Sequence, residues 1–539
     1  MRQWWEDAVF YQVYPRSFAD ANGDGIGDLA GIAGKLGYLS ELGVDALWIS
    51  PFFASPMKDF GYDISDYRGV DPMFGSLADF DRLAAEARRR GIRIVLDMVV
   101  NHSSDEHPWF VEARASRLSP KHGWYLWAPE TGRPPNNWKA VFELGTAWHP
   151  NPATGERYLG TFTRHQPEFD WRNPELREAI YAEMRFWLER GVDGFRLDVA
   201  TGYIKDAELR SNPFMLNASP NLFQRHIYDR NRPEVHGIFK EMRKLADAAG
   251  ERVLIGETHG QDPVLAASCH GERNDELHMA FNFDFLFQKK WEARSFRESA
   301  ERWYALLPAG AWPNFTLSNH DQPRAIFRYR SRDPRVTEGR ARVAAAMLLT
   351  LRGTPFIYYG EELGMSCRRL PRKALRDPLG VNTWPLGFLG RDPERTPMQW
   401  DASPNAGFSA APAEPWLPVN PDYVSRNVAV QAAEPGSLLS WYKALIALRR
   451  GSAALREGSI AFQGLHEEVL AYERAAGAER VLVLLNFASV PRRVELGSAC
   501  RVLLGSAPAR GGSGPRVPGD ELAAGELELR PCESLVLAR

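Results

Sequence analysis

Apolar segments that end in acids limit the folds open to this chain. Four short segments each read as a buried strand that runs into polar residues, at 97–102, 194–200, 254–257 and 318–321. Parallel α/β barrels place their functional side chains at the carboxyl ends of their strands. The pattern therefore predicts that Asp198, Glu257 and Asp321 gather in one pocket.

The strand candidates alternate with amphipathic helix patterns along most of the chain. Eight such candidates occur, at 9–14, 46–50, 93–100, 194–199, 253–258, 281–285, 314–321 and 354–362. Eight strands with helices between them favour an α/β fold closed as a (β/α)8 TIM barrel.

The spacing of the strand ends indicates an insertion. Asp97 and Asp198 lie 101 residues apart, whereas Asp198 to Glu257 and Glu257 to Asp321 span only 59 and 64. The excess predicts a subdomain inserted after strand three, and short alternating strands near the C-terminus predict an antiparallel β-sandwich. The expected domains are a barrel at 1–102 and 171–452, the subdomain at 103–170 and the sandwich at 453–539. The irregular stretch 364–435 should overhang the barrel mouth.

Composition excludes several classes of function. With 66 Lys and Arg against 68 Asp and Glu, the formal net charge is −2, so no field attracts nucleic acid. No apolar run approaches the ~18 residues of a membrane helix. The N-terminus lacks the pattern of a signal peptide, and the four cysteines are scattered, so we expect a cytoplasmic protein with free thiols, as a monomer or a small homo-oligomer.

Further motifs stand beside the four acid segments in a fixed order. They are AVFYQVYPRSF at 8–18, FGYD at 60–63 and RTPMQW at 395–400. With these, nearly the whole chain resembles the α-amylase-like glycoside hydrolases, and within them the α-glucosidase and oligo-1,6-glucosidase branch. The resemblance implies a retaining, exo-acting α-glucosidase that releases terminal glucose from short α-glucosides through a covalent glucosyl-enzyme.

The three acids receive different roles. Asp198 follows Arg196 by two residues, so both side chains should share a strand face, and the guanidinium should keep a nucleophilic carboxylate ionised. Glu257 follows an apolar segment, which predicts a raised pKa and an acid/base role. Since two acids suffice for glycoside cleavage, the third needs its own role. The resemblance implies that Asp321 holds sugar hydroxyls and the distorted transition state.

The resemblance also implies a closed glucose pocket. Tyr62 supplies a stacking platform, and Asp59 binds hydroxyls at the non-reducing end. In similar glucosidases this Asp pairs with an Arg of the loop after strand eight, for which Arg391 is favoured over Arg395. A pocket closed at that end removes single terminal glucose units.

The remaining candidates surround the bound sugar. The resemblance implies that His102 and His320 hydrogen-bond its hydroxyls. Phe162 and Gln166 match an aromatic and an amide at the end of the inserted subdomain, with a packed aromatic and a surface amide as the alternative. Val199, next to the nucleophile, accompanies α-1,6 cleavage in similar enzymes, but QPEFD at 166–170 departs from the QPDLN of that branch, so α-1,4 cleavage stays open.

The loop DANGDGIGD at 20–28 places oxygen ligands at alternate positions, as in the first part of an EF-hand loop. Position twelve is Gly31 instead of Glu, so it is not an EF-hand. Hard oxygen ligands suit a structural Ca²⁺, with Mg²⁺ as the alternative ion and a metal-free turn as the alternative structure. The ligands implied by the resemblance are Asp20, Asn22, Asp24, the Ile26 carbonyl and Asp28.

Two other functions remain under consideration. A transglucosylase or sucrose-cleaving enzyme would transfer the same glucosyl-enzyme to a sugar instead of water. A non-catalytic carbohydrate-binding or transporter-associated relative would need a membrane helix or a broken acid triad, and the sequence has neither.

Overall fold

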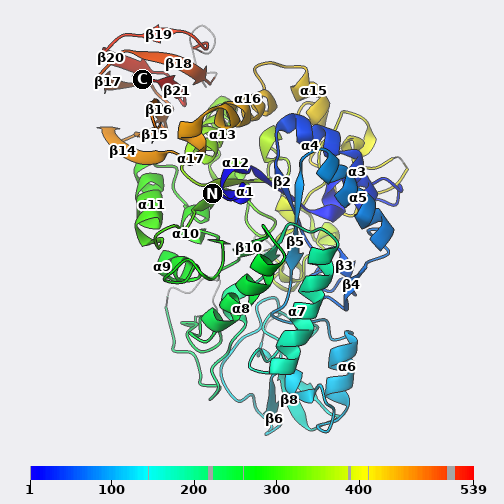
Figure 1. Cartoon of the computed structure of the whole chain (residues 1–539). Coiled ribbons are helices and arrows are strands. Elements are labelled where there is room, and N and C mark those ends of the chain that lie inside the picture. The colour runs from blue at the N-terminus through cyan, green and yellow to red at the C-terminus, as the bar shows by residue number, and fades with distance from the viewer. Residues whose placement is uncertain are drawn as a thin grey trace.

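The computed structural model describes residues 2–143, 145–216, 223–258, 260, 262–385, 390–410, 412–506 and 516–539. Its centre is an eight-stranded parallel sheet in the order β11-β10-β9-β5-β2-β1-β13-β12 (Figure 1). The strands are β1 (Phe10–Val13), β2 (Ala46–Ile49), β5 (Arg93–Met98), β9 (Gly194–Leu197), β10 (Val253–Gly256), β11 (Met279–Ala280), β12 (Asn314–Thr316) and β13 (Thr354–Tyr358). The Asn314 side chain donates to the Ala280 carbonyl at 2.9 Å, which links the two end strands. The predicted β/α barrel is confirmed.

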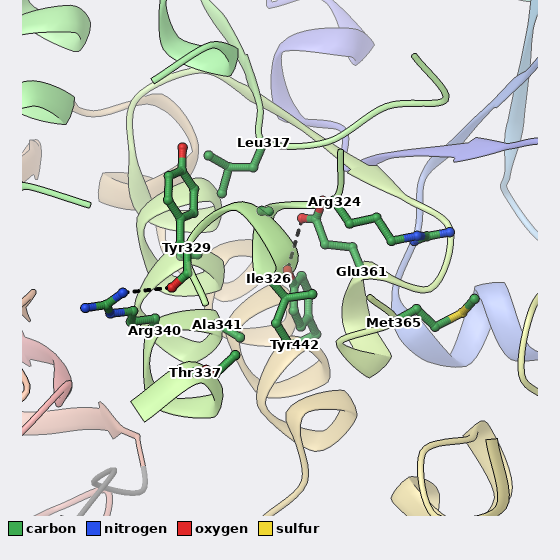
Figure 2. Close-up of a pocket in the computed structure, with 12 residues that line it drawn as sticks. Leu317, Arg324, Ile326, Tyr329, Thr337, Arg340, Ala341, Glu361, Met365 and Tyr442 are labelled. Atoms are coloured by element: carbon green, nitrogen blue, oxygen red, sulfur yellow. Dashed lines mark hydrogen bonds between the residues drawn. The ribbon is translucent and has the colours of Figure 1, made fainter. Parts of the chain in front are cut away.

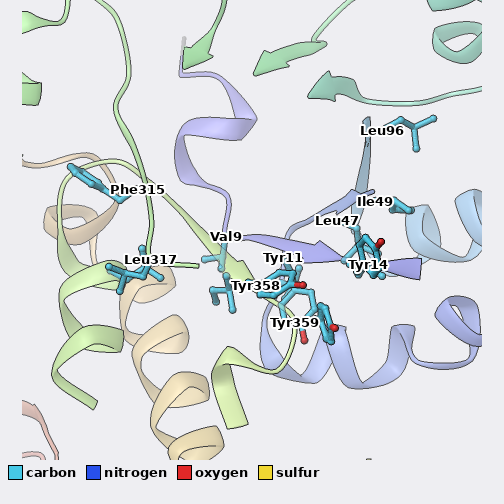
Figure 3. Packing of buried hydrophobic residues seen from close by; sticks show 14 of the residues in the cluster. Val9, Tyr11, Tyr14, Leu47, Ile49, Leu96, Phe315, Leu317, Tyr358 and Tyr359 are labelled. Atoms are coloured by element: carbon cyan, nitrogen blue, oxygen red, sulfur yellow. The ribbon is translucent and has the colours of Figure 1, made fainter. Parts of the chain in front are cut away.

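Both faces of the barrel strands are buried, and alternate side chains along a strand pack in two different apolar clusters. Tyr11, Leu47 and Ile49 pack outward in the main core (Figure 3), whereas their neighbours Phe10 and Trp48 pack in a separate inner cluster. This alternation follows from the two-residue period of a strand. The outer layer contains α4 (Leu36–Leu42), α5 (Leu77–Arg89), α7 (Pro174–Glu189), α8 (Val235–Ala248), α11 (Ala293–Leu306), α13 (Pro334–Thr350) and α16 (Leu438–Gly451).

The sixth strand was predicted wrongly. The sequence pattern placed it at 281–285, but the strand is β11 and the aromatic run continues into the short helix α10 (Phe283–Leu286). The Asn282 side chain accepts the Phe285 N–H at 3.4 Å and caps this helix. Asn at such a position offers the backbone an alternative to strand pairing.

The segment after β5 forms its own small layer. It contains α6 (Pro108–Ala115) and the antiparallel sheet of β6 (Trp127–Pro129), β8 (Glu156–Leu159) and β7 (Trp148–Asn151). The loop after β9 packs onto it, because Trp138 Nε1 donates to the Arg210 carbonyl at 3.1 Å and Asn136 Nδ2 to that of Leu209 at 3.0 Å. The sequence did not predict this second contribution from the loop after β9.

The C-terminal strands form two antiparallel sheets at one end of the molecule, beside α13 and α16 (Figure 1). The larger sheet has the order β14 (Ser459–His466), β15 (Val469–Ala476), β16 (Glu479–Asn486), β21 (Ser534–Ala538), β18 (Cys500–Gly505) and β19 (Glu521–Leu522). The smaller sheet pairs β17 (Arg492–Leu496) with β20 (Gly525–Leu529), and both sheets share one apolar cluster. The predicted sandwich is confirmed, whereas the exact domain boundaries stay predictions. No helix in the described part of the chain could cross a membrane.

Candidate active site

Acids from three strand ends meet on one guanidinium. Arg196 Nη1 lies 2.7 Å from Asp97 Oδ1 and 2.7 Å from Asp198 Oδ1. Arg196 Nη2 lies 2.7 Å from Glu257 Oε2. Because Arg196 is on β9, between β5 and β10 in the barrel, it reaches the acid at the end of each neighbouring strand. The predicted pair Asp198 and Glu257 therefore shares one cation.

The electrostatic surroundings of these acids differ from the prediction. Burial raises the pKa of Asp198 well above its usual range, and Arg196 opposes this rise only in part because Asp97 and Glu257 compete for the same charge. The predicted apolar setting of Glu257 is wrong. Its Oε2 accepts the Val199 N–H at 3.1 Å besides pairing with Arg196.

Val199 lies outside the strand that precedes it. Strand β9 ends at Leu197, and Val199 adopts a left-handed conformation with φ 46°. The prediction that Val199 continues the strand is therefore wrong. A left-handed β-branched residue costs about 1–3 kcal/mol and is typical of functional turns. This turn directs the Val199 N–H to Glu257, and the Gly202 N–H closes it on the Val199 carbonyl at 2.7 Å.

Asp321 is held by cations on another side of the pocket. Its Oδ1 lies 2.7 Å from Arg395 Nη2 and 3.3 Å from Arg391 Nη1, and its Oδ2 lies 3.2 Å from His320 Nε2. Burial raises the pKa of Asp321, but the neighbouring His320, Arg391 and Arg395 outweigh it and leave the pKa well below its usual range. Asp321 is therefore the acid most strongly held as a carboxylate.

The predicted pairing of Asp59 with Arg391 is present, and these two residues are called the carboxylate clamp. Asp59 Oδ1 pairs with Arg391 Nη2 at 2.7 Å. Arg395 instead donates from Nε to the His320 carbonyl at 2.7 Å. Asp377, which sequence reasoning missed, also binds Arg391, with 2.7 Å from its Oδ1 to Nη2. No motif of the sequence analysis pointed to Asp377.

Tyr62 and His320 form a stacked pair beside the acids. Their ring centroids are 5.4 Å apart with an interplanar angle of 1°, and Tyr62 Oη donates to Asp97 Oδ2 at 3.0 Å. Nδ1 of the His320 ring lies 2.7 Å from Gln12 Nε2. Burial lowers the pKa of His320 well below its usual range. Gln12, on β1, is a further site residue that the sequence analysis did not nominate.

The end of the inserted subdomain contacts the site residues Asp59 and His102. Gln166 Nε2 lies 3.1 Å from both Asp59 Oδ2 and His102 Nε2, and the side chain is completely buried. The alternative interpretation of Gln166 as a surface amide is therefore wrong. The Phe162 ring lies 5.3 Å from that of His102, whose pKa burial lowers to about 3. His102 is thus neutral, and its ring nitrogens already have partners, because Nδ1 lies 3.2 Å from Asn101 Nδ2 and Nε2 lies 3.0 Å from the Tyr62 carbonyl.

A separate cavity is lined mostly by residues of α12 (Ala325–Arg328), α13 and α16 (Figure 2). Leu317, Arg324 and Tyr442 are among its lining residues, and Tyr442 Oη donates to Glu361 Oε1 at 3.1 Å. Its volume of about 20 Å³ is near that of one water molecule, so it cannot hold a sugar. Burial raises the pKa of Glu361 to about 7.

The loop at 20–28 is ordered by its own side chains. Asp20 Oδ1 accepts the Gly23 N–H at 2.7 Å, and Asp24 Oδ1 accepts the Ile26 N–H at 2.8 Å. Asp28 accepts the Gly31 N–H at 2.6 Å and caps α3 (Leu29–Gly34). The residues described, which include this whole loop, contain no cluster of three or more His, Cys, Asp or Glu suited to a metal ion. The calcium prediction therefore stays a prediction.

The fold and site together define a class: β/α-barrel enzymes with several acids at the carboxyl ends of their strands. A family model described as the α-amylase catalytic domain matches residues 12–458. The chain therefore belongs to the α-amylase family of glycoside hydrolases, as its motifs predicted.

Relatives share nearly the full length of the chain. A probable alpha-glucosidase of Rhizobium meliloti is 44% identical over 510 residues, 92% of this chain and 91% of that protein. An oligo-1,6-glucosidase of Parageobacillus thermoglucosidasius is 39% identical over 525 residues, 90% of this chain and 91% of that protein. Among solved structures, the alpha-glucosyl transfer enzyme XgtA matches with TM-score 0.92 and 40% identity, covering all of both chains. A variant of the trehalulose synthase MutB in complex with Tris matches with TM-score 0.90 and 37% identity, again over both full chains.

Proposed function

We propose that this protein is a retaining, exo-acting α-glucosidase that releases terminal glucose from short α-glucosides of the maltose and isomaltose type. The observation that carries the proposal is the placement of Asp198 and Glu257 on one guanidinium beside a carboxylate clamp. The names of the relatives, alpha-glucosidase and oligo-1,6-glucosidase, support the same activity.

In the proposed mechanism Asp198 attacks the anomeric carbon while Glu257 gives its proton to the leaving oxygen, so the glycosidic bond breaks as the glucosyl–Asp198 ester forms. Glu257 then takes a proton from water, whose oxygen displaces Asp198. Arg196 donates to both carboxyl groups, and the Val199 N–H helps to orient Glu257. Asp321, fixed by Arg395, binds hydroxyls of the distorted sugar.

The proposed exo action rests on the clamp. Asp59 and Arg391 are both buried, and Asp59 also accepts a hydrogen bond from Gln166. A glucose unit whose non-reducing end contacts this pair leaves no path for a longer chain beyond it. The polymer interior should therefore be a poor substrate.

The anomeric form of the first product tests the mechanism. We expect α-glucose as the only sugar first released from p-nitrophenyl α-glucoside, observed by ¹H NMR before mutarotation. An initial β-glucose signal would indicate inversion and contradict the assignment. Asp198→Asn should lower turnover by several orders of magnitude in a folded protein, and near wild-type turnover in this variant would exclude Asp198 as nucleophile.

A second candidate is glucosyl transfer to a sugar or alcohol acceptor. The similarity to an alpha-glucosyl transfer enzyme and a trehalulose synthase favours it, because the same intermediate serves both outcomes. Product analysis with sucrose, maltose and isomaltose separately decides between them. Hydrolysis predicts only the component monosaccharides of each substrate, whereas transfer predicts new oligosaccharides or glucosides beside the released leaving group.

We further propose a structural Ca²⁺ on the loop at 20–28, with Mg²⁺ as the alternative ion. Its support is the set of hard oxygens on Asp20, Asn22, Asp24, Asp28 and the Ile26 carbonyl, whose lone pairs are not exhausted by the loop hydrogen bonds. Chelation should lower the melting temperature more than the turnover at 25 °C. Loss of activity without loss of stability would contradict a structural role.

We propose a cytoplasmic location. None of the four cysteines, all of which lie in the described part of the chain, forms a disulfide. Proteins of reducing compartments have this pattern. Fractionation of the source cells, with a periplasmic marker as control, tests the location.

A further inference from the structure

Asp377 makes three hydrogen bonds to a single arginine of the proposed pocket. It lies in the segment after β13, at the start of α14 (Pro378–Asn382), and is completely buried. Its Oδ2 accepts the Arg391 N–H at 2.8 Å, and its Oδ1 accepts Nε at 3.0 Å and Nη2 at 2.7 Å. Backbone and side chain of Arg391 are therefore fixed by the same carboxylate.

A second carboxylate fixes Asp377 itself. Asp392 Oδ2 accepts the N–H groups of Arg376 and Asp377 at 2.7 and 2.9 Å. Burial raises the pKa of Asp377, but Arg391 and Arg395 outweigh it and hold the pKa below its usual range. Asp377 is thus a carboxylate in a fixed position. It occupies the Nε hydrogen of Arg391 and one direction of Nη2, so it determines which guanidinium hydrogens can contact other groups.

The Nη2 atom of Arg391 that binds Asp377 also reaches Asp59, the carboxylate proposed to bind the sugar. Nη2 lies 2.7 Å from Asp59 Oδ1, and the guanidinium carbon lies 4.2 Å from the Phe142 ring centroid. In the described part of the chain, Arg391 is the single cation within ion-pair distance of Asp59. Asp321 differs, because Arg395 binds it at 2.7 Å while Arg391 is 3.3 Å away. Displacement of Arg391 would therefore affect Asp59 more than Asp321.

We propose that Asp377 is a positioning residue that holds the Arg391 guanidinium against Asp59, and that it thereby sets the affinity of the pocket for the non-reducing end of a terminal glucose unit. This inference rests on the proposed function. It predicts an effect on substrate binding with little effect on the chemical step, since uniform binding changes KM and not kcat.

The test compares Asp377→Asn and Asp377→Ala with a matched control, Glu533→Gln. Glu533 is a buried carboxylate in the C-terminal domain, paired with Arg516 Nη1 at 2.6 Å. Kinetics are measured on p-nitrophenyl α-glucoside and its 4-deoxy analogue, and glucose binding is measured by calorimetry. The ratio of kcat/KM between the two substrates does not depend on the fraction of folded enzyme, so it remains informative for a destabilised variant.

We expect KM and the glucose Kd to rise about tenfold in Asp377→Ala and less in Asp377→Asn, with kcat within about threefold of wild type. The preference of wild type for the 4-hydroxyl, expected at about tenfold or more, should fall below about threefold in Asp377→Ala. Glu533→Gln should lose stability without either change.

Values of KM, Kd and 4-hydroxyl preference within about twofold of wild type in both Asp377 variants would overturn the inference. An equal change in Glu533→Gln would also overturn it, because the effect would then be a general loss of stability. If wild type lacks glucosidase activity, the proposed function fails, and the glucose Kd alone decides the role of Asp377.

Discussion

Arg196 is the cation shared by three acids, and this sharing governs the electrostatics of the site. One positive charge lies among Asp97, Asp198 and Glu257, and burial raises the pKa of both Asp97, to about 6, and Asp198. Protons bound by such a group belong to the cluster and not to one residue. The sequence predicted the contact between Arg196 and Asp198. It did not predict that Asp97 and Glu257 would bind the same guanidinium.

We expect the Val199 side chain to influence whether α-1,4 or α-1,6 linkages are cleaved. Val199 follows the proposed nucleophile in a left-handed turn, and its bulky apolar side chain should narrow the entrance for the leaving sugar. Val199→Ala and Val199→Thr should raise the kcat/KM ratio of maltose over isomaltose about tenfold, within the ~1–3 kcal/mol of a methyl-sized change in a pocket. Initial rates on both disaccharides measure the ratio. An unchanged ratio in both variants would show that Val199 does not set linkage.

We expect the buried His270 to make the stability of the folded protein depend on pH. His270 is completely buried, neither ring nitrogen has a hydrogen-bond partner among the described residues, and burial lowers its pKa from 6.5 to about 3. Between these values the unfolded chain binds a proton that the folded protein does not, so stability falls as pH decreases from about 6.5 toward 3.

Replacement of His270 should remove this contribution. His270→Gln should reduce the slope of unfolding free energy against pH between 6.5 and 5 by up to about 1.4 kcal/mol per pH unit, measured by urea unfolding. Trp303→Phe alters the ring packed 6.2 Å from His270 without removing a titratable group, so it should keep the wild-type slope. Equal slopes in wild type and His270→Gln would contradict the pKa assignment.

At the scale of elements, two distant loops support each other at the barrel mouth. The loop after β1 contacts the long segment after β13, because the Trp416 N–H donates to the Gly25 carbonyl and the Asp20 N–H to the Phe408 carbonyl, both at 2.9 Å. The sequence predicted that the long segment overhangs the barrel mouth. Its contact with the loop after β1 was not predicted and is seen only in the tertiary structure.

Gly25 tests this loop contact. Its φ is 90°, and a Cβ there would lie 2.1 Å from the Glu414 carbonyl oxygen. Gly23 has a similar φ of 81° but open space around its Cβ. Gly23→Ala should cost about 1 kcal/mol of stability through backbone strain, and Gly25→Ala about 1–2 kcal/mol more because the loops must separate. Denaturant unfolding measures the difference, and equal costs would refute the contact.

At the scale of the whole molecule, the C-terminal domain is joined to the barrel by buried polar contacts. Arg474, on β15, is completely buried and donates to the carbonyl of Thr350, on α13 of the barrel, at 2.7 Å. Within the C-terminal domain it also donates to the carbonyls of Gly458 and Ser459 at 3.0 and 3.1 Å. Trp291 stacks on Phe487 with centroids 4.5 Å apart. These contacts join the domain to the barrel and contribute to the stability of the folded protein.

Arg474→Leu should destabilise the protein by about 2 kcal/mol or more, because it removes a donor from the buried carbonyls of Thr350 and Gly458. KM and kcat at 25 °C should remain unchanged. Arg539→Leu removes an exposed ion pair with Glu473 in the same domain and should cost less than about 1 kcal/mol. Equal effects of the two substitutions in urea unfolding would contradict this interface.

The sequence alone determined the barrel, the sandwich and the gathering of Asp198, Glu257 and Asp321, because strand periodicity and strand-end position are local properties of the chain. Only the tertiary structure decided the partners of each charged group. Asp377, Gln12 and the turn at Val199 carry no local pattern, since their roles depend on segments brought together from distant parts of the chain. Burial and shared charges act through space, and for that reason the predicted surroundings of Asp198 and Glu257 were wrong while their positions were right.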